Sequence, residues 1–259
     1  MILIDTHTHL YSDAFKEDRA EMIQRALDQN VGRFFVPAID TSYYEAMWDL
    51  KKLFPEIVHL MMGLHPCSVK KETYQAELDF VKTELETNKY IAVGEIGVDL
   101  YWDKSTLDIQ QQAFQQQIKW SKQFDLPINI HCRDAFEETF EVLENERDGL
   151  NGVFHCFTGT LEDAHRAINL GLKLGIGGVV TFKNGKIDQF LDQIPLKHLV
   201  LETDSPYLAP APFRGKRNES AYLSLVAQKL AIIYGQTVEE IAKQTSENAI
   251  EVFKKGVKS

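Results

Sequence analysis

The chain has 259 residues, of which 44% are hydrophobic and 25% are charged, a mixture typical of a globular protein and not of a disordered, collagenous or coiled-coil chain. Its 28 basic and 38 acidic residues give a formal net charge of −10, which opposes indiscriminate binding to nucleic acid or anionic membrane but allows a local basic patch. Three cysteines are too few for a disulfide framework, and no apolar run is long enough for a transmembrane helix. We therefore expect a cytoplasmic protein without a signal peptide or membrane association, with one domain over residues 1–259.

Short apolar runs alternate with helical patterns along the whole chain. Such runs are typical of strands that are buried on both faces of a parallel sheet. Eight strand–helix units in about 250 residues predict an α/β fold of the (β/α)8 TIM-barrel type. No Gly-x-Gly-x-x-Gly sequence follows the first run, which weakens the Rossmann-type alternative. The runs are Ile2–Ile4, Phe34–Ile39, Ile57–Leu64, Ile91–Ile96, Pro127–Ile130, Gly152–Phe154, Leu172–Val180 and Leu199–Leu201.

Several helical patterns carry start or stop signals. Gly32 is the predicted stop of the first helix. Ser105 with Asp108, and Thr237 with Glu240, have the spacing of a capping box. The helical patterns that these signals bound include Met22–Leu27, Gln110–Phe124 and Ile241–Phe253.

Histidines and carboxylates stand at the ends of the apolar runs. In a parallel barrel the carboxyl ends of all strands meet at one face, where barrel active sites are built. Crowded imidazoles and carboxylates are costly to bury unless a divalent cation holds them together. Six candidate ligands exceed the three or four that one zinc ion needs, so a carboxylate bridging two ions would use them economically. The candidates are His7, His9, Glu95, His131, His155 and Asp204.

Glu202 lies two residues before Asp204, so its side chain has the same inward phase in a strand. A buried carboxylate needs a partner. Glu202 could orient one of the metal-binding imidazoles, or it could form an ion pair deeper in the barrel, and the sequence leaves both roles open.

The candidate ligands belong to six longer motifs. These are Asp5-Thr6-His7-Thr8-His9-Leu10, Gly63-Leu64-His65-Pro66, Gly94-Glu95-Ile96-Gly97-Val98-Asp99, His131-Cys132-Arg133-Asp134-Ala135, His155-Cys156-Phe157-Thr158-Gly159 and Glu202-Thr203-Asp204-Ser205-Pro206-Tyr207-Leu208. The ordered set resembles the TatD family of metal-dependent deoxyribonucleases, which belong to the amidohydrolase-like barrels. The resemblance extends from residue 5 to about residue 219 and thus covers nearly the whole chain.

The resemblance implies an enzyme that hydrolyses DNA phosphodiester bonds with a water activated by two divalent ions, such as Mg²⁺, Mn²⁺ or Zn²⁺. Position by position, the six candidates above match the family's metal ligands, and Glu95 is the expected bridge. His65 matches a residue near the scissile phosphate, where it would donate a hydrogen bond. Asp204 is the expected acceptor of the water's proton. A pocket at the mouth of the barrel suits a DNA end, single-stranded or frayed, so we expect exonucleolytic cleavage.

The segment Phe213–Ser220 resembles the family's basic loop. Arg214, Lys216 and Arg217 follow the last strand, and we expect them to bind DNA phosphates. The alternative is a solvated loop whose charges pair with Glu219 or with other surface acids.

A helix is predicted over Leu223–Tyr234, directly after this loop, with Asn218 or Ser220 as its N-cap. The positive end of that helix and its unpaired amides would add to phosphate binding. The family often has His where this chain has Phe213, and Pro where it has Ser220. These departures concern substrate binding.

Two other functions remain open. The same scaffold could hydrolyse a small ester, amide or phosphoester, because a fold does not fix a substrate. Glu95 stands at the fourth strand where a carbamylated lysine would be expected in the amidase variants, which disfavours them. A metal-binding scaffold of low activity is the other alternative, and the complete ligand set argues against it. No obligate protein partner is inferred.

Overall fold

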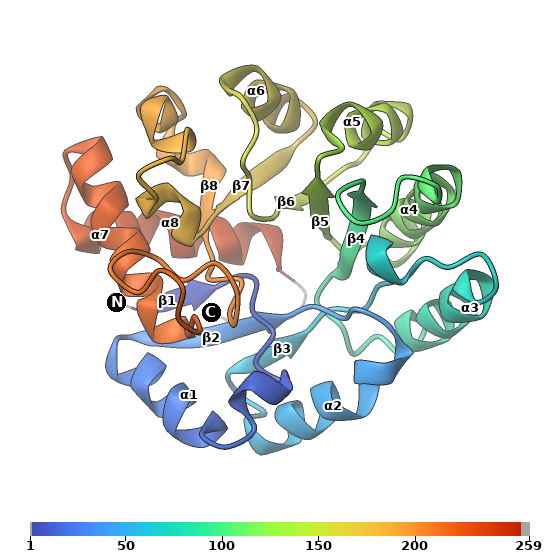
Figure 1. The fold of residues 1–259 in the computed structure, drawn as a ribbon, viewed down its shortest axis with the longest axis horizontal. Coiled ribbons are helices and arrows are strands. Elements are labelled where there is room, and N and C mark those ends of the chain that lie inside the picture. Colours follow the sequence, from blue (N-terminus) through green and yellow to red (C-terminus); the bar gives the residue numbers. More distant parts are fainter. Residues whose placement is uncertain (1, 255–259) are drawn as a thin grey trace.

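In the part of the chain that the computed structural model describes, residues 2–254, eight parallel strands form the ring at the centre of Figure 1. The sequence predicted each of them, with ends that differ by a few residues. The strands are β1 Leu3–Asp5, β2 Val31–Val36, β3 Val58–Leu60, β4 Val93–Asp99, β5 Ile128–Arg133, β6 Gly152–Phe154, β7 Leu172–Ile176 and β8 Leu199–Leu201.

The strands form two sheets, and hydrogen bonds at two junctions between these sheets close the ring. Strands β1 to β3 pair in order, as do β4 to β8, and every pair is parallel. The Thr6 amide donates to the Leu201 carbonyl (3.0 Å), which joins the first strand to the last, and the Gly94 amide donates to the Met62 carbonyl (3.0 Å). The predicted (β/α)8 TIM barrel is therefore confirmed.

The helices surround the ring (Figure 1), and apolar residues of the helices pack against those of the strands. The connection from β7 to β8 differs from the expected pattern, because within residues 2–254 it contains only short 3-10 turns. The helix Leu223–Tyr234 packs against two of these turns. The helices are α1 Arg19–Asp28, α2 Tyr44–Leu53, α3 Tyr74–Leu85, α4 Leu107–Phe124, α5 Phe136–Asn145, α6 Leu161–Asn169, α7 Leu223–Tyr234 and α8 Val238–Val252.

The inside of the barrel has its own small apolar core. Ile4, Phe35, Val153 and Val200 belong to it, one from each of four strands. Phe253, at the end of α8, packs on Phe35 with ring centroids 4.8 Å apart. The C-terminal helix thus covers the amino ends of the strands, and the polar residues lie at the opposite end of the barrel.

Two predicted element ends are wrong: the end of the first helix and the end of the seventh strand. Helix α1 ends at Asp28, since Asn30 has a φ of 60° and its carbonyl accepts from the Leu3 amide, so Gly32 lies inside β2 and not at the helix stop. Strand β7 ends at Ile176, and the remainder of the run forms a 3-10 turn, η4 (Gly178–Thr181).

One of the two predicted capping boxes is confirmed. The Thr237 hydroxyl accepts from the Glu240 amide, and the Glu240 carboxylate accepts from the Thr237 amide. The other is wrong, because Asp103 captures both the amide and the hydroxyl of Ser105 (2.8 and 2.6 Å), and Thr106 takes the N-cap position of α4.

The three cysteines, Cys67, Cys132 and Cys156, are all unbridged thiols. Of the helices in residues 2–254, none combines the length and the apolar character that a bilayer-crossing segment needs.

Candidate metal centre

The six predicted ligands lie together at the carboxyl ends of the strands. Together with His65, they form overlapping groups in which the ligand atoms lie within 4.8 Å of one another. The groups are His7, His9 and Glu95; His7, His155 and Asp204; and His65, Glu95 and His131.

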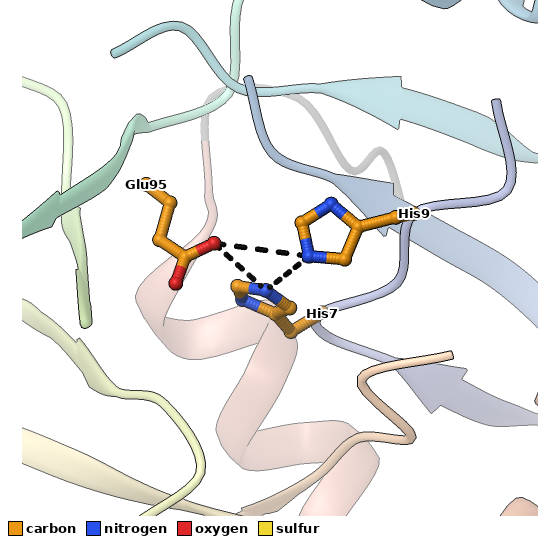
Figure 2. Close-up of side chains that lie close together, drawn as sticks. All are labelled: His7, His9 and Glu95. Carbon is orange, nitrogen blue, oxygen red and sulfur yellow. Dashed lines mark hydrogen bonds and ion pairs between the residues drawn. The ribbon is translucent and has the colours of Figure 1, made fainter. Parts of the chain in front are cut away.

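Figure 2 shows the first of these groups, with the imidazoles of His7 and His9 turned toward Glu95. The Nε2 atoms of His7 and His9 are 3.2 Å apart, and Glu95 Oε2 lies 3.2 Å from His7 Nε2. Asp204 Oδ1 lies 3.5 Å from His9 Nε2 and 3.8 Å from His7 Nε2. Two nitrogens and two carboxylates therefore converge on one point.

Glu95 is shared between two halves of the cluster. Its Oε2 faces His7, whereas its Oε1 lies 2.8 Å from His131 Nδ1 and 3.3 Å from His155 Nε2. The side chain is almost fully buried. One carboxylate in this position can serve two cations, one with each oxygen.

In His7 and His9, Nε2 is the inner nitrogen that faces the cluster and Nδ1 is the outer one. The hydrogen bonds of the outer nitrogens determine that the inner nitrogens carry lone pairs. His7 Nδ1 donates to Asn129 Oδ1 (2.8 Å). His9 Nδ1 donates to the Tyr11 hydroxyl (2.9 Å), since that hydroxyl donates its own proton to the Pro37 carbonyl. The Nε2 atoms are therefore left unprotonated and 3.2 Å apart, and two such lone pairs repel each other unless a cation or a proton lies between them.

Carboxylates hold the outer nitrogens of the two imidazoles on the other side of the cluster. His131 Nε2 donates to Asp99 Oδ2 (2.8 Å), and His155 Nδ1 donates to Glu202 Oε1 (3.1 Å). An imidazole that donates its outer N–H to a carboxylate is a typical ligand arrangement in metal sites. Of the two roles open to Glu202, the structure supports orientation of an imidazole.

His65 has the opposite arrangement. Its Nδ1 accepts from the Cys67 amide (3.0 Å), so Nε2 carries the proton in the neutral ring. Nε2 lies 3.4 Å from Glu95 Oε1. His65 therefore presents a hydrogen-bond donor to the cluster, whereas His7 and His9 present lone pairs.

Burial and mutual charge set the protonation of the cluster. Burial, with the neighbouring His155, lowers the pKa of His7, so its ring is neutral at neutral pH. Burial alone would raise the pKa of Glu95, but the surrounding imidazoles hold that pKa well below its usual range. For His155 burial opposes the charged form, yet Glu202 and Glu95 raise its pKa well above 6.5. Its inner nitrogen must therefore release a proton before it can bind a cation.

Backbone geometry keeps two carboxylates in place. Asp204 has a φ of 55°, in the left-handed region, and its amide donates to the His7 carbonyl (2.9 Å). Such strain in a non-glycine residue is often found at functional sites. Glu202 needs Gly175 on the neighbouring strand, because a Cβ there would collide with Glu202 Oε2.

Sequence reasoning assigned no role to Asn129, Tyr11 or Asp99. Asn129 lies two residues before His131 in β5, so the alternation of side chains in a strand could have identified it, whereas Tyr11 lies beyond the end of β1 and gives no such signal. Asp99 lies four residues beyond Glu95 in β4, so the same alternation could have placed it on the side of Glu95.

The donor set fits divalent metal ions. It combines neutral imidazoles with ionised carboxylates, which are the ligands that zinc and related ions accept in proteins. The inner lone pairs of His7 and His9, and the two separated oxygens of Glu95, face a common space. The described residues thus form clusters that can hold metal ions, and their donor atoms do not select one metal.

The basic loop contacts the barrel rim, and its three cations do not gather at one point. Arg217 forms a bidentate pair with Asp18 (both 2.7 Å). The Arg214 guanidinium stacks on Phe182, 3.6 Å from the ring centroid, and Lys216 is exposed. Phosphate binding by this loop stays a prediction.

The predicted cap of helix α7 is wrong. Asn218 Nδ2 donates to the Thr203 carbonyl and the Ser220 hydroxyl donates to Asp5, so both side chains face the barrel. A 3-10 turn, η8 (Ser220–Tyr222), precedes the helix, and Tyr222 occupies the N-cap without a side-chain hydrogen bond. Neither Asn218 nor Ser220 therefore caps helix α7 beside the basic loop.

Two relatives match this sequence over nearly their whole length. "Uncharacterized metal-dependent hydrolase YabD" of Bacillus subtilis (strain 168) is 38% identical over 255 residues, which cover 98% of this chain and 99% of that protein. YcfH of Escherichia coli (strain K12), also called an uncharacterized metal-dependent hydrolase, is 34% identical over 260 residues, 98% of this chain and 96% of that protein.

Solved structures agree. The crystal structure of YJJV, a TatD homologue from Escherichia coli K12, superposes with a TM-score of 0.90 at 30% identity and covers 97% of this chain and 98% of that one. A TatD-family hydrolase from Entamoeba histolytica has the same fold, with a TM-score of 0.86 at 20% identity over 98% of both chains. The family described as TatD-related DNase matches residues 4–254. This chain therefore belongs to the family of TatD-related DNases.

Proposed function

We propose that this protein is a metal-dependent deoxyribonuclease that hydrolyses phosphodiester bonds at DNA ends. The observation that carries the proposal is Glu95, whose two oxygens face different histidines of one buried cluster. Two-metal sites that hydrolyse phosphodiester bonds hold their ions about 3.5–4 Å apart, and a carboxylate shared between the ions could keep them at that distance. Family membership supports DNA as the substrate.

The proposed ligands are His7, His9, His131, His155, Glu95 and Asp204. When bound, divalent ions polarise the phosphoryl group and make water a stronger nucleophile at neutral pH. Asn129 and Tyr11 hold the rings of His7 and His9 through their outer nitrogens, so that their inner nitrogens stay available.

Asp204 is the proposed acceptor of the proton that the attacking water loses. Its carboxylate is the more exposed of the two in the cluster, with 15% of the side chain accessible against 3% for Glu95. Burial raises its pKa, but the positive charge of His155 helps to lower the pKa below its usual value, so Asp204 is ionised. An ionised carboxylate that is open to the substrate side can take up the proton.

His65 is the proposed donor to the phosphoryl oxygens. Burial lowers its pKa, so the ring is neutral, and the Cys67 amide keeps the proton on Nε2. A donor preset in this way stabilises negative charge that develops on the phosphoryl group during attack.

The test uses single-stranded DNA labelled at either end, with Mg²⁺ or Mn²⁺ and with a strong chelator. We expect stepwise shortening from one end, loss of activity with the chelator and no cleavage of a circular single strand. Glu95→Gln is the matched inactive variant. Hydrolysis of small esters or amides without any cleavage of DNA would overturn the proposal, as would full activity of extensively dialysed, metal-free protein.

A further inference from the structure

The exposed aromatic side chains of residues 2–254 all lie at the carboxyl ends of the strands. They are Tyr43 after β2, Tyr101 and Trp102 after β4, and Tyr207 after β8. Trp102 is 71% exposed and Tyr101 is 51% exposed. Large aromatic surfaces left in solvent beside a catalytic cluster are typical of a binding site.

Tyr101, Trp102 and Arg133 form one cluster, which we name the aromatic shelf. The Arg133 guanidinium lies 3.6 Å from the Tyr101 ring centroid and 5.6 Å from that of Trp102. The two rings are nearly perpendicular, with centroids 4.8 Å apart. Within residues 2–254, no ion pair with a carboxylate neutralises Arg133. The shelf therefore offers an open indole face and a cation together.

Asp99 fixes this shelf relative to the proposed metal centre. Its Oδ1 accepts from the amides of Tyr101 (3.0 Å) and Trp102 (3.3 Å), while its Oδ2 accepts from His131 Nε2 (2.8 Å). The carboxylate is buried, so the connection is shielded from solvent. A single side chain thus connects the shelf to a proposed ligand, so the shelf lies next to the proposed metal centre.

We propose that the aromatic shelf binds an unpaired base of the DNA strand whose phosphodiester bond lies at the metal centre. This inference rests on the proposed function and names its preferred substrate form. Stacking on aromatic rings and on arginine is the main means by which proteins hold single-stranded nucleic acid, and every base has a face to offer. A base inside a duplex has both faces covered by its neighbours, so the shelf selects single strands and frayed ends.

Binding of a nuclease-resistant phosphorothioate thymidine oligonucleotide, measured by fluorescence anisotropy with Mn²⁺ present, tests the shelf. An abasic strand of the same length is the matched ligand, because it keeps the phosphates and lacks the bases. We expect the wild-type protein to prefer the thymidine strand, and Trp102→Ala to weaken its binding roughly five- to hundredfold, the range of stacking on one aromatic ring. Affinity for the abasic strand should stay unchanged.

Trp102→Phe should keep most of the preference, and Ile232→Ala, at a 79% exposed residue of α7, should keep all of it. Because Trp102 is largely exposed, its truncation removes little packing, and circular dichroism together with metal content verifies the fold. An undiminished preference for the thymidine strand in Trp102→Ala would overturn the shelf while chelator-sensitive cleavage of DNA still stood. If the wild-type protein neither cleaves DNA nor binds either strand, the proposed function itself fails.

Discussion

The histidines of the cluster have the same side chain and two different roles, and their outer hydrogen bonds distinguish them. His7 donates through Nδ1 to Asn129, which leaves a lone pair at Nε2. His65 accepts at Nδ1 from the Cys67 amide, which leaves a proton at Nε2. The first arrangement favours a cation and the second favours an anionic oxygen of the substrate. The sequence located both residues, but only the structure shows whether Nε2 of each ring carries a lone pair or a proton.

This difference predicts separate effects of two substitutions. Glu95→Ala should lower both metal content and activity, the latter by orders of magnitude, because one carboxylate is proposed to serve both ions. His65→Ala should lower activity by roughly 10²–10³-fold, as the loss of one preset donor does, and leave metal content unchanged. Metal analysis of the purified variants and steady-state assays on single-stranded DNA check both.

Retention of both metals in Glu95→Ala would show that the bridging role is wrong. Loss of metal in His65→Ala would show that this ring binds a cation and not the substrate. Asp204→Ala, expected to lose activity with the protein still folded, is the comparison for a ligand that also accepts a proton.

At the level of elements, the sequence predicted strands better than helix ends. Strands buried on both faces are apolar along their length, and this signal does not depend on neighbours. Helix ends depend on local competition: Thr237 caps α8, whereas Asp103 captures Ser105 and prevents it from capping α4. The missing helix after β7 was also not predictable, because α7 from the following unit packs against that connection.

Thr237→Ala tests the confirmed cap. Loss of the hydroxyl that accepts from the Glu240 amide should destabilise the protein by about 1 kcal/mol, the usual effect of removing an N-cap. Ser105→Ala is the matched control and should change stability by less than about 0.5 kcal/mol, as expected for a surface residue that caps nothing. Urea unfolding of both variants measures the difference, and equal effects would contradict the assignment.

The basic loop gives a prediction about salt dependence. If Arg214 and Arg217 each neutralise one phosphate of a single strand, replacing both with alanine should flatten the slope of log K against log salt concentration by roughly 1.4. Arg217 must then exchange its pairing with Asp18 for a phosphate. Anisotropy titrations over a range of salt concentrations measure the slope, and metal content should not change. An unaltered slope would show that the phosphates are bound elsewhere.

In the whole molecule, the cluster couples metal binding to pH. Burial opposes protonation of His131 and His155, but Asp99 and Glu95 raise the pKa of the first, and Glu202 and Glu95 raise that of the second. The contacts of these imidazolium rings with carboxylates stabilise the fold fully at pH values below about 6.5, the pKa of histidine in the unfolded chain. This contribution is lost as the pH rises through the raised pKa values that the two histidines have in the folded protein. Cations compete with these protons for the same inner nitrogens.

Added Mn²⁺ should therefore raise the unfolding temperature more at pH 8 than at pH 6. Thermal unfolding with Mn²⁺ and with a chelator at both pH values gives the two increments, and calorimetry in buffers of different ionisation enthalpy should show proton release on binding. Equal increments at pH 6 and pH 8 would contradict ligation by these histidines. Activity should fall below about pH 6 for the same reason, since imidazole has to be neutral to bind a metal.

The junction between the first and the last strand has a consequence for synthesis. The Thr6 amide pairs with Leu201, and the Asp204 amide pairs with the carbonyl of His7, so both partners of each bond come from opposite ends of the chain. A nascent chain that has not yet extended past β8 has neither this seam nor the carboxylate of Asp204. Asp204, the last residue of the proposed metal centre in the sequence, is therefore synthesised late in translation, and a fragment truncated before β8 should be inert.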